Sequence, residues 1–599
     1  MDIAGWLRAA AGAIPRLCVG QQVRRFLRAT ADCRGQQREV LRRLMALNAD
    51  SRFSLEHGLD RVRDAADFRR RLGVNDYEFF RPWIEQLKEG DFQSLLGSRN
   101  RLLMFSLTSG TTSQSKFIPI TRQFLDDYRR GWQVWGLRTF DDHWGIFTRK
   151  IAQITSDYDR FRTPGGTPCG NISGLAATMQ RPIVQTMYNV PAVVSRIPDS
   201  EAKYYTALRL AIADVHTAMV TTANPSTLIH LARMAEEVSD LLIRDIADGT
   251  LSSEYHVPTE IRRRLGWRTR RRNRRRARWL EDLRQRTGRF YPSDYWPELR
   301  VVAVWTGGSA AAYLPGMRQY YDGIPIRDHG LSASEGRMTI PFVDERPEGV
   351  LDVTTHYFEF IPEEAYGTPS PTVLEAHELE EGSCYYILLT TASGLYRYDI
   401  CDVVRCTGFC GTTPVLEFLH KGSHIANLTG EKIAESQVVA AVCQCAERMH
   451  LRLRHFTVSP AWSDPPRYQL LVEELDLHSP REGRRLAQTV DRRLQELNCE
   501  YREKRTSGRL GGLEWLSVPA GTWKRLAADR VQSLGGSLEQ YKHPCLVPEI
   551  DFAARLLAGG ASRSPGAEAA AGRGVEAPET TGARADRTPA LANVQSTRH

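Results

Sequence analysis

The chain has 599 residues, too many for one compact core, so two or more domains are expected. Hydrophobic residues make up 42% and charged residues 25%, an ordinary balance for a globular protein that excludes a fibrous or largely disordered class. The formal net charge of +9 indicates an anionic partner, and nucleotides, carboxylates, RNA and acidic lipid head groups all remain candidates.

The N-terminal segment Met1 to Leu17 is apolar but is interrupted by Arg8 and Arg16. It lacks the uninterrupted apolar region and small-residue cleavage site of a targeting signal, so we expect a helix docked on its own domain. No stretch of the sequence reaches the ~20 apolar residues that cross a bilayer. These features predict a cytoplasmic protein.

Residues 20–95 are expected to be helical, because apolar side chains recur there at helical spacing with arginines on the other face. From about Leu102 short apolar runs predict buried strands, each followed by a glycine-rich turn or a helical segment. Such runs are Leu102–Phe105, Val301–Val304 and Tyr386–Leu389. This alternation predicts an α/β protein with mixed β-sheets flanked by helices.

The segment Arg262–Arg286 is very rich in arginine, with tryptophan and leucine at intervals. A solvated helical face or an exposed inserted loop is the favoured interpretation. The alternative is a surface for RNA or membrane phosphates. No nucleic-acid-binding motif accompanies the arginines, so contact with nucleic acid or membrane through this segment is not expected.

The strand pattern breaks near Phe418–Gly422, which predicts a hinge at Lys421-Gly422-Ser423. A smaller α/β section follows, with helices expected over 434–449 and 484–497 and a strand over 468–472. From about Ala558 the composition lacks the bulky apolar residues of a core and predicts disorder.

The eleven cysteines are scattered and predict free thiols. Cys401, Cys406 and Cys410 lie close together, and Cys443 and Cys445 form a C-x-C pair. Neither group has the paired spacing of zinc ligands, so no metal cluster is expected.

The first group that carries chemistry is Ser106-Leu107-Thr108-Ser109-Gly110-Thr111-Thr112-Ser113-Gln114-Ser115-Lys116, directly after an apolar strand. Small hydroxyl residues and a glycine let the backbone close around phosphate oxygens, and the lysine adds positive charge. The spacing differs from the Walker pattern. A plain turn is the alternative interpretation of this loop.

Two glycine-containing groups follow later strands. In Trp305-Thr306-Gly307-Gly308-Ser309 the glycines would allow a flat ring to lie against the backbone, with a tight turn as the alternative. In Leu331-Ser332-Ala333-Ser334-Glu335-Gly336 the hydroxyl of Ser334 beside the Glu335 carboxylate suits Mg²⁺, which binds few carboxylates plus substrate phosphates. Taken alone, Glu335 is better explained as an exposed surface residue.

The segment Gly394–Val404 contains two aspartates. Asp402, at the end of a strand, is the candidate acceptor for both ribose hydroxyls, and Asp399 is expected at the surface or paired with Arg397 or Arg405. Further on, Thr429-Gly430-Glu431-Lys432 and Gln540-Tyr541-Lys542 place lysines in the small section. Solvent exposure is the ordinary explanation of any single lysine.

The order and spacing of these groups resemble the adenylate-forming superfamily of acyl-CoA synthetases, luciferases and peptide-synthetase adenylation domains. Within it the sequence is most similar to the Gretchen Hagen three family of acyl acid amido synthetases. The resemblance runs from about Gln36 to Val547. It is carried by Asp67-Phe68-Arg69, Tyr77-Glu78, Tyr291-Pro292, Trp296-Pro297, Phe358-Glu359-Phe360-Ile361-Pro362, Gly394-Leu395-Tyr396-Arg397-Tyr398 and Gln540-Tyr541-Lys542-His543-Pro544.

The resemblance implies a role for each matching residue. Thr108, Ser109, Gly110, Thr111 and Thr112 would contact the phosphates of ATP, and Thr306 and Gly307 would lie near adenine. Ser334 and Glu335 would serve phosphate and Mg²⁺, with Glu335 the metal ligand, and Asp402 would hold the ribose. Lys421 resembles the basic hinge residue. Lys432 and Lys542 resemble lysines brought in by a mobile domain, and Lys542, Glu335 and Lys432 would be catalytic.

Four residues, at three places in the chain, depart from the family pattern. Ser113-Gln114 stand where glycine is usual, and Cys401 replaces the glycine usual before the ribose aspartate. Lys421 stands where arginine is common, and these two side chains are not interchangeable at a bidentate contact. The first departure is expected to alter the geometry of the phosphate loop, and none of them removes an indispensable group.

The resemblance implies an ATP-dependent, Mg²⁺-requiring ligase that adenylates a carboxylic acid and transfers the acyl group to an amine, with an amino acid as the expected acceptor. The transfer would follow a turn of the small domain about the hinge. A thioester-forming acyl-CoA synthetase and an inactive RNA- or membrane-binding relative are the alternatives. The implied division is a large ATP- and acyl-acid-binding domain over 1–417, a hinge over 418–424, a small mobile domain over 425–555 and a disordered tail over 556–599. A monomer is expected, and neither acid nor amine is identified.

Overall fold

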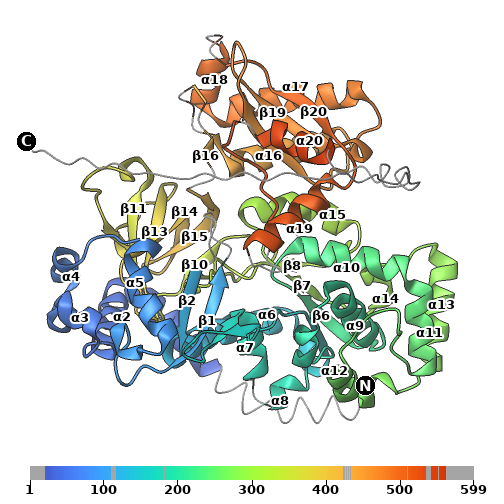
Figure 1. Ribbon diagram of the computed structural model, residues 1–599, viewed down its shortest axis with the longest axis horizontal. Coiled ribbons are helices and arrows are strands. Elements are labelled where there is room, and N and C mark those ends of the chain that lie inside the picture. Colours follow the sequence, from blue (N-terminus) through green and yellow to red (C-terminus); the bar gives the residue numbers. More distant parts are fainter. Residues whose placement is uncertain are drawn as a thin grey trace, which may run out of the picture.

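The structure is a computed structural model that describes residues 20–108, 116–180, 182–422, 425–426, 428–429, 431, 433–506, 508, 510–534, 541–550 and 552–561. The predicted α/β class is confirmed: several sheets are flanked by helices, and a smaller α/β part lies above a larger one in the view of Figure 1.

The predicted N-terminal helices are confirmed. Residues 20–29 are helical, and α2 (Cys33–Leu47), α3 (Arg52–Glu56), α4 (Ala65–Arg71) and α5 (Tyr77–Glu89) follow. Side chains of the residues that precede these four helices accept hydrogen bonds from the first-turn backbone, as good N-caps do. Apolar residues on their inner faces, such as Phe53, Phe68 and Phe80, are fully buried against the neighbouring sheet.

That sheet has the strand order β12-β11-β13-β14-β15-β10-β9 and is antiparallel throughout. Its strands are β9 (Thr339–Ile340), β10 (Gly349–Leu351), β11 (Tyr357–Pro362), β12 (Leu374–Glu375), β13 (Cys384–Thr390), β14 (Tyr398–Cys410) and β15 (Thr413–Lys421). The register of β14 and β15 places Asp402 directly opposite Lys421. β15 continues through Phe418 and ends at Lys421, the first residue of the predicted hinge segment Lys421-Gly422-Ser423.

The predicted phosphate loop joins two antiparallel strands, β1 (Leu102–Thr108) and β2 (Lys116–Thr121). β1 also pairs in parallel with β5 (Pro168–Gly170), which pairs with β4 (Phe161–Arg162). The loop residues 109–115 lie outside the described residues.

A parallel sheet with the order β3-β6-β7-β8 forms the second half of the large part. Its strands are β3 (Lys150–Gln153), β6 (Thr217–Thr221), β7 (Val301–Ala303) and β8 (Ile326–Arg327). Because parallel strands end at one edge, the segments after them converge there. The helices around it are α6 (Arg122–Asp142), α7 (Ile172–Thr178), α8 (Pro182–Gln185), α9 (Ser200–Ile212), α10 (Pro225–Glu237), α11 (Ser239–Asp248), α14 (Pro292–Tyr295) and α15 (Leu314–Arg318).

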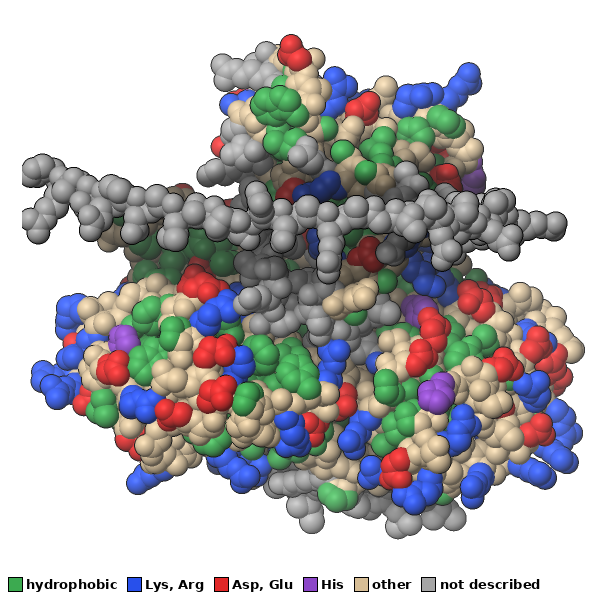
Figure 2. All heavy atoms as spheres, in the orientation of Figure 1, with side chains coloured by type: hydrophobic (Ala, Val, Ile, Leu, Met, Phe, Trp, Pro, Cys, Tyr) green, Lys and Arg blue, Asp and Glu red, His purple; other side chains and the backbone are tan. Residues whose placement is uncertain are grey.

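The arginine-rich segment forms two helices, α12 (Thr259–Thr269) and α13 (Arg274–Thr287), rather than a loop. Several guanidinium groups are used structurally: Arg262 donates to the carbonyl oxygens of Leu251 and Ser252, and buried Arg276 donates to those of Ile212 and Tyr295. Other arginines face solvent, and Figure 2 shows Lys and Arg side chains along the lower right edge, where Figure 1 draws α11 and α13.

The small C-terminal part contains the sheet β18-β19-β20, with β18 (Phe456–Ala461), β19 (Arg467–Glu473) and β20 (Glu514–Val518), and the short pair β16 (Ile425–Ala426) and β17 (Ile433–Ala434). Its helices are α16 (Glu435–Arg448), α17 (Pro480–Leu497), α18 (Cys499–Thr506), α19 (Thr522–Leu534) and α20 (Phe552–Ala561). The helices and strand predicted here are confirmed. Val438, Leu470 and Leu486 are fully buried in its core.

The predicted tail over 556–599 begins too early. Residues 556–561 belong to α20, and Leu556 and Leu557 pack against a cluster that contains Trp523 and Val547. The sequence pattern missed them because two leucines among small residues are a weak signal of packing. Residues 562–599 lie outside the described residues.

The sequence predicts neither a metal cluster nor a membrane-spanning helix. No cluster of three or more His, Cys, Asp or Glu side chains in the described part of the chain could hold a metal ion, and the cysteines described are free. In the same residues no helix has both the length and the apolar character to cross a membrane.

Candidate functional site

Asp402 and Lys421 form the fixed centre of the candidate site. The Lys421 ammonium donates to Asp402 Oδ1 at 2.9 Å and to the carbonyl oxygen of Ile400 at 3.1 Å. Desolvation disfavours the charge of Lys421, but Asp402 and Glu335 outweigh it, so the pKa of Lys421 is raised. Asp402 is buried, with one carboxylate oxygen bound by Lys421. The pairing across β14 and β15 thus fixes the carboxylate of the residue that the sequence predicts to hold the ribose.

The residues before Asp402 form a strained turn within β14. Cys401 has φ of 58°, in the left-handed region that favours glycine, which gives a physical reason for the glycine that the family pattern has there. Asp399 accepts from the Cys401 backbone N–H at 2.7 Å and from the Tyr366 hydroxyl at 2.7 Å. The predicted ion pairing of Asp399 is wrong.

The arginines expected beside Asp399 have other partners. Arg397 pairs with Glu359 at 2.9 Å, and Arg405 pairs with Glu417 at 2.5 Å. Glu359 also accepts from Arg69 at 2.7 Å, which links two of the sequence pieces that carry the family resemblance. These ion pairs therefore connect the pieces to one another within the frame of the site.

Glu335 is buried, with 7% of its surface exposed, so its interpretation as a surface residue is wrong. Burial raises the pKa of Glu335, and Asp402 adds to this, while Lys421 and Lys116 oppose it. The neighbouring Ser334 hydroxyl accepts from Ser106 Oγ at 3.0 Å, which ties this turn to β1. Glu335, Asp402 and Lys421 are therefore brought close enough to affect one another's charge.

Asp328 is a site residue that the sequence interpretation missed. Its Oδ2 accepts from the backbone N–H of Thr306 at 2.5 Å and from the Thr306 hydroxyl at 2.7 Å, and its Oδ1 accepts from the Gly330 N–H at 2.5 Å. Burial raises the pKa of Asp328 to about 6 although these hydrogen bonds oppose the shift. Its position directly after β8, at the carboxyl edge of the parallel sheet, was the available signal.

The segment after β7 lies beside the end of β15. A side chain at Gly308, where φ is 57°, would collide with the Phe418 ring at 2.6 Å. At Gly307 an added carbon would meet Phe418 and Pro347 at ordinary contact distances, so Gly307 is not required by packing. The backbone that Thr306 and Gly307 present is thus held by Asp328 on one side and by β15 on the other.

Lys542 reaches this site from the small part. Its ammonium lies over the Trp305 ring, 4.7 Å from the centroid, and the Trp305 indole donates to the carbonyl of Gly330 at 3.1 Å. Part of the Lys542 side chain is exposed to solvent. Desolvation of its ammonium by the surrounding protein nevertheless lowers the pKa of Lys542. Lys421 adds to this and Asp402 opposes it.

The remaining predicted residues cannot be placed. Ser109, Gly110, Thr111, Thr112 and Lys432 lie outside the described residues. Thr108 is the last residue of β1, so the loop begins at the end of that strand beside Ser106 and Ser334.

The possible metal ligands at this site suit Mg²⁺ better than a metal ion that is coordinated by protein side chains alone. Glu335 offers a carboxylate next to a serine hydroxyl, and the described residues contain no three-ligand cluster. Mg²⁺ usually keeps waters and binds through one or two carboxylates together with substrate phosphates. A phosphate-bearing substrate would therefore have to complete the coordination.

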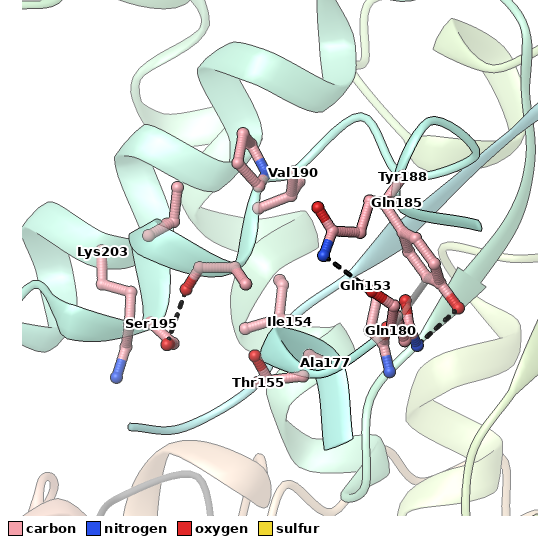
Figure 3. A pocket seen from close by; sticks show the side chains of 13 residues that line it. Gln153, Ile154, Thr155, Ala177, Gln180, Gln185, Tyr188, Val190, Ser195 and Lys203 are labelled. Carbon is pink, nitrogen blue, oxygen red and sulfur yellow. Dashed lines mark hydrogen bonds between the residues drawn. The ribbon is translucent and has the colours of Figure 1, made fainter. Parts of the chain in front are cut away.

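A separate small cavity of about 40 Å³ lies beyond β3 (Figure 3), lined by Gln153, Ile154 and Thr155, with Gln180, Gln185, Tyr188 and Lys203 around it. Gln180 donates to the Tyr188 hydroxyl at 3.4 Å. This space has room for about three water molecules.

The geometry can be compared with known proteins. The sequence matches the GH3 family N-terminal domain over residues 22–326, the GH3 family central domain over 349–421 and the GH3 family C-terminal domain over 436–550. The chain belongs to the GH3 family. The family resemblance predicted from the sequence is confirmed.

Two curated relatives and one solved structure show how far the GH3 likeness extends. Rice (Oryza sativa subsp. japonica) jasmonoyl–L-amino acid synthetase GH3.5 is 26% identical over 88% of this chain and 94% of its own. Arabidopsis thaliana indole-3-acetic acid-amido synthetase GH3.6 is 27% identical over 85% and 88%. The structure of GH3.15 acyl acid amido synthetase superimposes with a TM-score of 0.78 at 21% identity, covering 91% of this chain and 96% of that one, which supports the same fold.

Proposed function

We propose that this GH3 chain is an acyl acid amido synthetase that adenylates a carboxylic acid with ATP and transfers the acyl group to an amine, an amino acid in the simplest case. One observation carries the proposal: Lys542 of the small part stands over Trp305, close enough to Asp402, Lys421 and Asp328 for their charges to affect it. Two relatives are named as synthetases that join an acyl acid to amino acids, which supports the proposal.

In the proposed first step a carboxylate oxygen of the acid attacks the α-phosphorus of ATP, and pyrophosphate leaves. Asp402, fixed by Lys421, would accept the ribose hydroxyls, and the backbone of Thr306 and Gly307 would lie against adenine. Thr108 and the loop 109–112 would donate to phosphate oxygens. Lys542 would offset the negative charge that builds up as two anions meet.

Glu335, with Ser334, would hold Mg²⁺, which when bound offsets the charge of the departing pyrophosphate. Burial raises the pKa of Glu335, and cationic partners would oppose that shift and favour its ionised form. Lys421 and Lys116 provide part of that positive charge.

In the proposed second step the amine nitrogen attacks the acyl carbonyl carbon, the carbon–oxygen bond to AMP breaks, and the nitrogen loses a proton to solvent. Lys542 occupies the site during the first step, so the small domain would turn about 418–424 to bring other groups in, Lys432 among them. The domain boundaries and the hinge are part of this proposal.

The proposal is tested by carboxylate-dependent exchange of labelled pyrophosphate into ATP, with a panel of acids. Lys542→Ala should lose exchange by about 100-fold or more, because one charged contact to the developing charge is removed. Lys504→Ala, on α18 of the same domain, is the control and should keep exchange close to wild type. Near-normal exchange by Lys542→Ala would refute the assignment.

The acceptor is tested by giving the enzyme both coenzyme A and a mixture of amino acids, with mass spectrometry of the products. Amide products are expected; a thioester would identify an acyl-CoA ligase instead. A monomeric state and a cytoplasmic location remain predictions from the sequence. Contact with RNA or membrane through Arg262–Arg286 remains the alternative that the sequence does not favour; backbone carbonyls occupy Arg262 and Arg276, and other arginines of the segment face solvent.

A further inference from the structure

Asn224 lies at the carboxyl edge of the parallel sheet, between β6 and α10, and makes a contact with the small domain that the proposed reaction does not yet use. Its side-chain Nδ2 donates to the carbonyl oxygen of Tyr541 at 2.7 Å. Tyr541 immediately precedes Lys542, so this carbonyl belongs to the peptide unit from which the Lys542 side chain begins. The hydrogen bond therefore links the large domain directly to the backbone of the proposed catalytic lysine.

The large-domain side of this contact is rigid. Asn224 Oδ1 accepts from the Ser226 N–H at 3.0 Å and caps α10, while its carbonyl oxygen accepts from the Thr222 hydroxyl at 3.0 Å. The preceding residue, Ala223, accepts from the Trp305 N–H at 3.2 Å. Asn224 is buried, and its amide is held in one orientation next to Trp305, the residue over whose ring the Lys542 ammonium lies.

On the other side of Lys542 the chain is anchored in the small domain. The His543 ring Nε2 lies 3.0 Å from both Thr457 Oγ1 and the carbonyl oxygen of Phe456, and Cys545 N–H donates to Glu435 at 2.7 Å. Lys542 thus stands between a peptide held by the large domain and a residue held by the small domain. If the small domain turns, the contacts of His543 travel with it, whereas the Asn224–Tyr541 hydrogen bond must break.

We infer that Asn224 is a positioning residue that holds the Lys542 loop in the adenylation arrangement and releases it for acyl transfer. This inference rests on the proposed function. It predicts that loss of the Asn224 amide donor weakens the first half-reaction and spares the second, because only the first needs Lys542 over Trp305. If Asn224 only capped α10, its replacement would affect both half-reactions alike.

The variant Asn224→Ser separates these roles. Serine is as good an N-cap as asparagine, so α10 keeps its cap, but its side chain is too short to reach Tyr541. Arg452→Ala is the matched control, because the Arg452 guanidinium makes an exposed 3.3 Å hydrogen bond from the small domain to Gln319 of the large domain. Both variants should unfold at the wild-type temperature.

With an acid that supports exchange in the wild type, Asn224→Ser should lower pyrophosphate exchange about 5-fold, the effect of one neutral hydrogen bond. The rate of aminolysis, measured with the matching acyl-adenylate added as substrate, should stay within about 2-fold of wild type. This limit is smaller than the effect expected from the loss of one hydrogen bond. Arg452→Ala should change neither. Equal losses in both half-reactions, or none, would overturn the inference.

A second readout requires no substrate. Small-angle X-ray scattering of the free full-length chain should show a changed distance distribution for Asn224→Ser and an unchanged one for Arg452→Ala. Identical scattering from all three proteins would overturn the inference. If no acid supports exchange in the wild type, the proposed function fails, and the scattering still decides whether Asn224 holds the domains.

Discussion

Cys401 illustrates how one backbone angle connects sequence and structure. The sequence marks it as a replacement for glycine, and its φ of 58° is a conformation that costs a residue with a side chain about 1–2 kcal/mol. The neighbours Asp399 and Asp402 both depend on this turn, since the Cys401 N–H donates to Asp399. The strain is therefore located where the proposed ribose-binding carboxylate is set.

Cys401→Gly should be more stable than Cys401→Ala by about 1 kcal/mol, because both variants remove the thiol and only glycine relieves the left-handed strain. Chemical denaturation of the two variants measures the difference. Equal free energies of unfolding would show that the turn is not strained.

The lowered pKa of Lys542 gives a prediction of pH dependence. The ammonium loses its proton as pH rises through a pKa below the ordinary 10.5, so pyrophosphate exchange should fall on the alkaline side. Arginine stays protonated, so Lys542→Arg, though slower, should keep its exchange rate constant where the wild type declines. The pH profile of both proteins measures this. Parallel declines would assign the alkaline limb to another group.

Among the elements, α12 and α13 show why an arginine run need not be a binding surface. Burial lowers the pKa of Arg276 to about 10, and its guanidinium donates to two backbone carbonyls, while the adjacent Arg275 faces solvent. Composition cannot separate these two residues, because which arginine points inward depends on how the helix packs.

Arg276→Ala should lower the free energy of unfolding by about 2–4 kcal/mol, since it leaves two buried carbonyl oxygens without donors and removes packing. Arg275→Ala is the matched control and should stay within about 0.5 kcal/mol of wild type. Urea denaturation of both variants checks this. A small effect at Arg276 would favour an accessible, partner-binding role for the segment.

At the scale of the whole molecule the C-terminal boundary matters for stability. Phe552 and Ala553 of α20 are buried in the cluster formed with Leu471, Val518 and Trp523. The apolar content of the sequence falls away after this helix. The folded small domain should therefore need α20.

A chain ending at Ala561 should keep the full-length stability, whereas one ending at residue 551 should lose about 3 kcal/mol or more, the cost of removing a buried aromatic side chain. Thermal unfolding of the two truncated proteins compares them. Similar losses in both would show that residues after 561 also contribute.

Local patterns predict much of the molecule. The helices of residues 20–95, the strands at 102, 301 and 386, and the helices of the small domain follow from periodicity, because side-chain spacing reports which face of an element is buried. Asp402 and Glu335 could be chosen because each has its place in the order of groups that carries the family resemblance. Asp328 was missed although it directly follows a strand, because β8 has only two residues and such a short strand leaves a weak pattern in the sequence.

The sequence by itself determined the fold class, the family resemblance and the residue types of the site, because these depend on spacing along the chain. Only the tertiary structure decided that Glu335 is buried, that Asp399 binds Tyr366, and that Asn224 reaches the carbonyl before Lys542. Asn224 and Tyr541 are 317 positions apart, and a hydrogen bond over that separation depends on how the two domains are packed, which no local pattern of side chains encodes.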